Sequence, residues 1–123
     1  MSYMTHDLKD DIIVVLDEEF DAQEVAKLQP KLESLVQRPS GDVVVDMSAV
    51  TFIDSSGVGA LVFLYKRLVT QGRDMVLVGL QGQPRDMLRL LRIDKTVSTF
   101  ESLNAYVRVH AQLSAAETEV VGG

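Results

Sequence analysis

A pair of serines at the start of a predicted helix is the part of this sequence best suited to chemistry. Residues 54–59 read Asp-Ser-Ser-Gly-Val-Gly and follow a short β-branched run at residues 43–45. The change from strand to helical spacing places Ser55 and Ser56 where a helix presents unpaired N–H groups and the positive end of its dipole. A hydroxyl there can cap the helix or carry a phosphate group, which the dipole favours. The predicted apolar face of this helix comprises Val58, Leu61, Val62, Tyr65, Leu68 and Val69.

Three roles for the serine can be weighed from the residues alone. The commonest is capping, in which Asp54 or Ser55 accepts a nearby backbone N–H, worth about 1 kcal/mol. A catalytic nucleophile is disfavoured, because no Gly-x-Ser-x-Gly frame is present and His6 and His110 fall in other predicted elements. A phosphate acceptor is physically reasonable, since the added charge would meet the acids of residues 17–21 and alter partner binding rather than the fold. The residues leave capping and phosphorylation both open.

The glycines and acids around the serines predict no bound cofactor. Gly57 and Gly59 lack the third glycine of a G-x-G-x-x-G fingerprint, and no Gly-Lys-Ser or Gly-Lys-Thr is present. We expect these glycines to allow close approach of helix and strand, or access of a partner to the helix start. The acids of residues 17–21 are expected to form a solvated turn rather than a metal site, and the lack of cysteine excludes thiolate ligands.

Composition bounds the class of protein. The 123 residues suit one domain with a single core, and the formal net charge of −6 argues against nucleic-acid binding. Residues 1–24 are strongly acidic and residues 61–95 are basic, a polarity that two ordinary solvated faces can explain. The sequence shows no secretory signal and no apolar run long enough to span a bilayer, so we predict a cytoplasmic protein that binds no membrane.

The elements that must position the serines alternate between strands and helices. Residues 3–8 and 11–16 are predicted to pair as a hairpin. Asp21 and Glu24 form an aspartate variant of the capping box and start a helix, which Pro30 should kink or interrupt. The predicted apolar face of that helix comprises Val25, Leu28, Leu32, Leu35 and Val36.

The second half of the chain continues this alternation. Residues 75–78 are a predicted buried strand, residues 79–83 a loop, and residues 96–98 a candidate edge strand. Pro84 suits the first position of a helix that covers Met87, Leu88, Leu91 and Ile93.

A last helix is predicted near the end of the chain. Ser98 with Glu101 could cap it. Residues 115–123 have no apolar period and are predicted to form a disordered tail, so that residues 1–114 make up the domain. The predicted apolar face of the last helix comprises Leu103, Tyr106, Val107, His110 and Leu113.

This order of elements predicts an α/β domain. We expect a mixed, mostly parallel sheet of roughly four to five strands, with about four helices mainly on one side. The carboxyl ends of parallel strands share one edge of such a sheet. The acidic turn at residues 17–21 and the turn at residues 54–57 should therefore lie close together.

The run Val-Val-Val-Asp-Met-Ser-Ala-Val-Thr-Phe-Ile-Asp-Ser-Ser-Gly-Val-Gly-Ala-Leu at residues 43–61 resembles the signature of STAS domains, specifically the bacterial anti-sigma factor antagonists. In that family an apolar strand leads into a segment like Leu-Asp-Ser-Ser-Gly-Leu-Gly and then into a helix. The resemblance covers most of the chain, from residues 20–21 to the final predicted helix. It implies a single STAS-like domain with a mixed sheet and no enzymatic activity.

The resemblance also implies a switch and its residues. In phosphorylatable members, the serine directly after the aspartate accepts phosphate, which corresponds to Ser55, with Ser56 the less favoured site. Unmodified protein would bind an anti-sigma factor, a serine kinase with a histidine-kinase-like ATPase fold, and phosphorylated protein would release it. A metal-dependent serine phosphatase would reverse the modification. The partner-binding residues would be Asp21, Asp54, Ser55, Ser56, Gly57, Val58 and Gly59.

Two other hypotheses belong to different functional classes. The domain could be a constitutive scaffold or regulatory subunit of a transporter ATPase or signalling complex that does not act on a sigma factor. The serines would then be a helix cap only. A small-ligand or nucleotide binder is the third hypothesis, which calorimetry with GTP or ATP would test.

Overall fold

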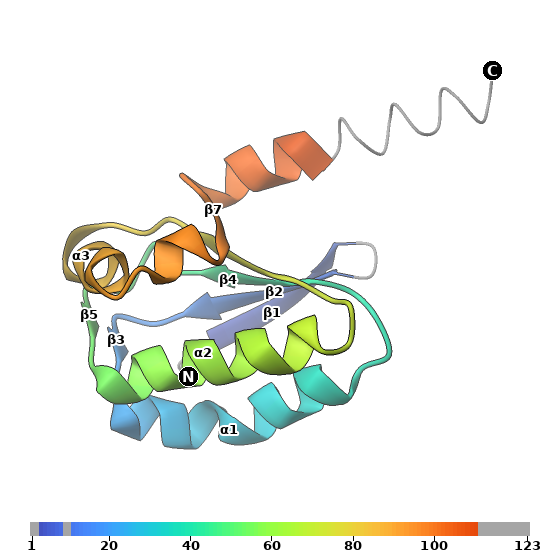
Figure 1. Cartoon of the computed structure of the whole chain (residues 1–123), viewed down its shortest axis with the longest axis horizontal. Coiled ribbons are helices and arrows are strands. Elements are labelled where there is room, and N and C mark those ends of the chain that lie inside the picture. The colour runs from blue at the N-terminus through green and yellow to red at the C-terminus, as the bar shows by residue number, and fades with distance from the viewer. Residues whose placement is uncertain (1–2, 9–10, 111–123) are drawn as a thin grey trace.

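The computed structural model describes residues 3–8 and 11–110, and Figure 1 shows the arrangement of their elements. The last described helix covers residues 103–110 and is called the C-terminal helix below. The predicted turn at residues 9–10, Leu113 and the predicted tail lie outside the described residues. In chain order the other elements are β1 (Tyr3–Leu8), β2 (Asp11–Leu16), β3 (Glu19–Phe20), α1 (Ala22–Gln37), β4 (Val43–Asp46), β5 (Phe52–Ile53), α2 (Ser55–Val69), β6 (Met75–Val78), α3 (Gly82–Leu90), the 3₁₀ turn η1 (Ile93–Lys95) and β7 (Ser98–Phe100).

The main sheet has five strands in the order β1-β2-β4-β6-β7. β1 is antiparallel to β2, and the remaining neighbours are parallel, with Val14 opposite Val45 and Val45 opposite Leu77. This arrangement confirms the predicted α/β class and the mostly parallel sheet. Short runs of β-branched and other apolar residues form the central strands because both faces of the sheet are covered.

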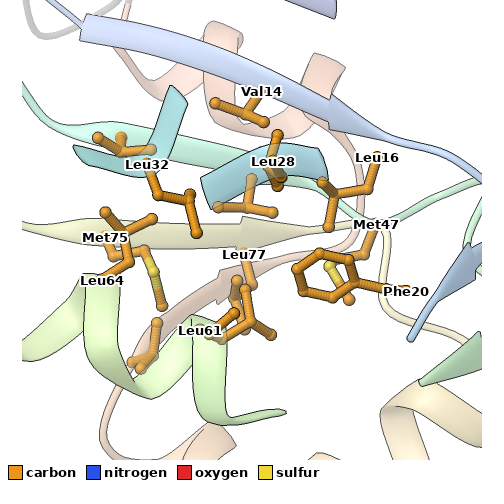
Figure 2. Close-up of a cluster of buried hydrophobic side chains, with 14 of the residues drawn as sticks. Val14, Leu16, Phe20, Leu28, Leu32, Met47, Leu61, Leu64, Met75 and Leu77 are labelled. Carbon is orange, nitrogen blue, oxygen red and sulfur yellow. The ribbon is translucent and has the colours of Figure 1, made fainter. Parts of the chain in front are cut away.

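Each face of the sheet has its own apolar cluster. On one face, alternate strand residues such as Val45 and Leu77 pack against α1, α2 and α3. On the other face, Val44 and Val76 pack against Tyr106 of the C-terminal helix. Figure 1 shows α1 and α2 side by side on one side of the sheet and the C-terminal helix on the other. Figure 2 shows part of the larger cluster, including Leu28, Leu32, Leu61, Leu64, Met75 and Leu77.

A second, two-stranded sheet lies beside the carboxyl edge of the main sheet. β3 and β5 pair in parallel, with Glu19 opposite Phe52 and Phe20 opposite Ile53. This short sheet was not predicted, because two-residue strands carry no periodic signal. It joins the acidic turn after β2 to the segment before α2, which confirms that the two turns lie close together.

Several predicted boundaries and faces differ from the structure. α1 runs through Pro30 without interruption, because Pro30 is exposed while Leu28 and Leu32 on either side are buried. The loss of one backbone hydrogen bond at Pro30 is offset by that packing. Val69 and Leu91, predicted on buried faces, are 46% and 50% exposed.

In the last third of the chain, the start of α3, the position of the edge strand and the cap of the last helix differ from the prediction. α3 begins at Gly82, so Pro84 is its third residue rather than its first. The edge strand is Ser98–Phe100, which pairs with β6, so Ser98 cannot cap the C-terminal helix. Ser102 caps that helix instead, since its Oγ accepts the backbone N–H of Ala105 at 3.1 Å.

Candidate functional site

Asp54 fixes the position of the serine segment through two hydrogen bonds. It precedes α2 with extended backbone angles, and its Oδ1 accepts the backbone N–H of Gly57 at 3.0 Å. Its Oδ2 accepts the N–H of Ala22, the first residue of α1, at 3.3 Å. One carboxylate therefore caps α2 and also binds the start of α1. Of the two caps that the sequence left open, the structure has Asp54 and not Ser55.

Asp21 does for α1 what Asp54 does for α2. Its Oδ1 accepts the N–H of Glu24 at 3.1 Å, and it has the same extended backbone conformation. The predicted capping role of Asp21 is confirmed. Figure 1 shows the starts of α1 and α2 next to each other, close to β3 and β5. Two helix N-termini, each with a partial positive charge, thus meet at one place on the surface.

Ser55 lies at the point where these N-termini meet. It is the first residue of α2 and is exposed, whereas Ser56 is half-buried. Within residues 11–110, the backbone N–H groups of Ser55 and Ser56 have no hydrogen-bond acceptor. Because Asp54 supplies the cap, the hydroxyl of Ser55 is not needed for the helix. The position combines an exposed hydroxyl with free donors, which suits a phosphate group.

The two glycines of the segment differ in their surroundings. A Cβ atom on Gly57 would lie 2.2 Å from the carbonyl oxygen of Phe20 and 2.7 Å from the side chain of Ile53. A Cβ atom on Gly59 would meet nothing within 4 Å. Gly57 allows α2 to approach the β3–β5 pair, as the sequence predicted for these glycines. Gly59 leaves an open, exposed strip of helix next to Ser55.

The segment predicted to bind partners therefore divides into exposed and buried positions. Asp21, Asp54 and Ser56 are partly exposed, and Ser55 and Gly59 are exposed. Gly57 and Val58 are buried, since α2 turns both of them toward the core. A docking partner would contact the first set directly and depend on the second only for the shape of the surface.

Gln83 supports the site in a way that the sequence did not reveal. Its side-chain amide accepts the N–H of Ile53 at 2.8 Å and donates to the carbonyl oxygen of Ile53 at 2.9 Å. The amide thus pairs with the free edge of β5 like one residue of a third strand. No local pattern marks this role, because Gln83 and Ile53 are 30 residues apart.

A second polar cluster lies at the opposite, amino edge of the main sheet. Asp11 is 9% exposed, and its Oδ2 accepts the hydroxyl of Tyr106 at 2.9 Å and lies 2.9 Å from Nε2 of His110. Burial, followed by the hydrogen bond to Asp11, raises the pKa of Tyr106 above its ordinary value. Arg73 lies at the same edge and is also buried, donating to the carbonyl oxygens of Gly41 at 2.7 Å and Arg38 at 2.9 Å.

The charges therefore do not simply form two solvated faces. Arg73, counted with the basic half of the sequence, is a buried structural residue, and burial lowers its pKa. In the described part of the chain, no three His, Cys, Asp or Glu side chains converge as metal ligands would. None of the helices described is both long and apolar enough to cross a membrane.

Comparison with known proteins defines the family. The family model of the STAS domain matches residues 3–106. The chain therefore belongs to the STAS domain family, as its serine segment indicated, and anti-sigma factor antagonists are among its structural neighbours.

Three solved structures show the range of these neighbours. An anti-sigma factor antagonist from Mycobacterium paratuberculosis is similar with a TM-score of 0.76 at 23% identity, over 88% of this chain and 92% of that chain. The Bacillus cell fate determinant SpoIIAA in its phosphorylated form is similar with a TM-score of 0.69 at 17% identity, over 88% of this chain and 99% of that chain. A sulfate transporter family protein from Wolinella succinogenes is similar with a TM-score of 0.67 at 18% identity, over 81% of this chain and 86% of that chain. At these identities the likeness shows a shared fold.

Proposed function

We propose that this protein is a phosphorylation-controlled anti-sigma factor antagonist without enzymatic activity of its own. In the unmodified form it binds an anti-sigma factor that is also a serine kinase with a histidine-kinase-like ATPase fold. Phosphorylation of Ser55 releases that partner, and a metal-dependent serine phosphatase restores binding. The STAS family and the antagonists among the structural neighbours support this class of function.

The observation that carries the proposal is the division of labour between Asp54 and Ser55. Asp54 caps α2 through its bond to Gly57 and leaves the exposed hydroxyl of Ser55 without a structural task. A serine that served only as a cap would accept the N–H that Asp54 takes here. A kinase can reach and modify Ser55 without breaking any hydrogen bond that holds the helix.

Electrostatics explains how modification would change binding but not folding. A phosphate adds nearly two negative charges, which the helix dipole and the free N–H groups of the first turn stabilise. The same phosphate lies in a region with the exposed acids Asp17, Glu18 and Glu19. A partner that accommodates this acidic region and a neutral serine would be repelled by the additional charge.

Paired pull-downs from the native lysate test the proposal. Ser55→Ala and Ser55→Glu proteins serve as baits, and Ser56→Ala and Ser56→Glu as the matched controls one residue away. We expect Ser55→Ala to retain a histidine-kinase-like ATPase that ATP cannot release, and Ser55→Glu to lose it. Both Ser56 variants should still bind, and the Ser56→Ala protein should still be released by ATP.

The outcomes separate the two candidate serines from each other. ATP-driven release of Ser55→Ala would contradict the assignment, and its loss in Ser56→Ala would move the site to Ser56. Phosphopeptide mapping of the wild-type protein after incubation with the recovered kinase then identifies the modified residue directly.

The second candidate function is a constitutive scaffold or regulatory domain of a transporter or signalling complex. The structural likeness to the Wolinella sulfate transporter family protein favours keeping it. Identical partner sets on all four baits, with no kinase among them, would support this function and exclude the switch.

A further inference from the structure

A groove lies between α2 and the segment that follows α3. It encloses about 190 Å³. Two cationic side chains line it, Lys66 from α2 and Arg92 from the segment between α3 and η1. The rest of its lining is largely apolar and includes Leu61, Val62, Tyr65, Leu91, Ile93 and Val97.

Arg92 has a backbone conformation that is unfavourable for a residue with a side chain. Arg92 has a φ of 61° and is the only residue other than glycine with a positive φ in the described part of the chain. It directly follows Leu91 at the end of α3, where glycine is the usual residue because it takes this conformation without strain. Keeping an arginine at this position costs stability, which points to a task for its side chain in the groove.

The groove also presents unpaired charge and unburied apolar surface. Leu91, which lines the groove, is 50% exposed. Among the described residues, neither Lys66 nor Arg92 has a carboxylate within ion-pair distance. An apolar hollow with a free cation on α2 and another after α3 is complementary to an apolar side chain flanked by acids.

We propose that this groove docks an acidic amphipathic segment of a partner protein. One large apolar side chain of that segment enters the cavity, and carboxylates on either side of it pair with Lys66 and Arg92. Lys66 is eleven residues beyond Ser55, about 16 Å along the helix axis, which is about twice the distance at which salt screens charge. Docking in the groove is therefore independent of the phosphorylation state of Ser55.

A designed peptide tests the groove without knowledge of the natural partner. The probe is a fluorescein-labelled helical peptide with one phenylalanine flanked by glutamates on the same face. Its anisotropy is measured against the full chain. One control peptide replaces the phenylalanine by alanine, and another replaces the glutamates by lysines. We expect binding of the first peptide only.

Protein variants assign the binding to the two cations. Lys66→Glu should weaken peptide binding about tenfold, because the reversal replaces attraction to the peptide's carboxylates by repulsion. Arg92→Gly should weaken it severalfold and, since glycine relieves the left-handed strain, raise Tm by about 2–4 °C. Arg85→Glu makes the same change of charge on α3 but borders a different pocket, so it should bind like wild type. Ser55→Glu should also bind like wild type, which separates this result from the outcome of the pull-downs.

Other results would overturn the proposal. Equal binding of the alanine or lysine peptide, or equal affinity of wild type, Lys66→Glu and Arg92→Gly, would show that the groove does not select acidic amphipathic segments. A fall in Tm for Arg92→Gly would show that Arg92 is required for folding rather than recognition. Concentration-dependent self-association that Arg92→Gly abolishes, measured by sedimentation, would assign the groove to a second copy of this chain.

Discussion

The two edges of the main sheet use the same residue type for opposite purposes. At the amino edge, Asp11, Asp42 and Asp74 each lie next to the start of a parallel strand. The N–H of Asp42 donates to Asp11 at 2.9 Å, and the N–H of Asp74 donates to Asp42 at 3.0 Å. At the carboxyl edge, Asp21 and Asp54 cap helices and leave an exposed serine beside them.

The two edges differ in whether their polar groups have hydrogen-bond partners within the protein. The amino edge is closed, because Tyr106 and His110 cover Asp11 from the C-terminal helix. The carboxyl edge is open, because Asp54 meets the needs of two helix starts and frees the hydroxyl of Ser55. Acidic residues alone therefore do not mark a site in this protein. What distinguishes the carboxyl edge is an exposed serine hydroxyl beside backbone N–H groups that are unpaired among the described residues, and the proposed function rests on that difference.

Alanine at Gly57 should have the largest effect and shows how tightly the carboxyl edge is built. Its Cβ atom would collide with the backbone oxygen of Phe20, which cannot move without shifting β3. We expect Gly57→Ala to lower the free energy of unfolding by roughly 3 kcal/mol or more in urea denaturation. Gly59→Ala is the matched control and should be neutral or stabilising by up to about 1 kcal/mol, since alanine favours the helix. Equal effects of the two substitutions would mean that the close approach at Gly57 is not required.

These two glycines illustrate how far the sequence predicted the site. The alternation of strands and helices predicted the parallel sheet, and the sheet predicted that the turns before α1 and α2 meet at one edge. For Gly57 and Gly59 together the sequence predicted either close packing of helix and strand or access of a partner to the helix start, because both belong to one short motif. In the structure Gly57 faces the β3–β5 pair and Gly59 does not. Which side of α2 faces that pair depends on tertiary packing, which a short motif does not encode.

Other features could not be predicted because they join distant parts of the chain. Tyr106 and Asp11 are 95 residues apart, and no periodicity relates them. The prediction that Pro30 could interrupt α1 was wrong, because packing of Leu28 and Leu32 outweighs one lost hydrogen bond.

Local capping chemistry predicted the cap at Asp21 correctly and left Asp54 and Ser55 both open. It was wrong at Ser98, because pairing with β6 places that residue in a strand.

Removing one hydroxyl should weaken the closed amino edge. Tyr106→Phe leaves a nearly buried Asp11 carboxylate without its tyrosine donor. The free energy of unfolding should fall by about 2 kcal/mol, measured by urea denaturation at neutral pH. Partner binding through Ser55 should not change, because the two clusters lie at opposite edges of the sheet. A loss of partner binding in a folded Tyr106→Phe protein would show that the edges are coupled.

The pH dependence of stability offers a separate check of this cluster. The pKa of Tyr106 is raised in the folded state, whereas an unfolded tyrosine ionises near pH ~10. The stabilising contribution of the protonated hydroxyl is therefore complete below about pH 10 and declines as the pH rises above that value. The decline should be smaller in Tyr106→Phe. An identical decline in both proteins above that pH would exclude Tyr106 as its source.

Substitution of Asp54 should have a smaller effect that spreads to both helices. Asp54→Ala removes the cap of α2 and the bond to Ala22, which together should lower the free energy of unfolding by about 1–2 kcal/mol. Asp54→Asn keeps an acceptor and should lose less than about 0.5 kcal/mol. Amide hydrogen exchange should show increased opening in the first turns of α1 and α2 in the alanine variant only. Increased exchange confined to α2 would show that the bond to α1 contributes nothing.

Substitution of Ser55 should have the smallest effect on stability and the sharpest effect on function. Ser55→Ala removes no hydrogen bond found in the described residues and places a good helix former at the first position of α2. The free energy of unfolding should change by less than about 0.5 kcal/mol, while release of the proposed partner by ATP is lost. A loss of about 1 kcal/mol instead, comparable to that of Asp54→Ala, would show that Ser55 contributes to the cap. The contrast between the open and closed edges of the sheet would then disappear, because the serine would be a structural residue like Asp11.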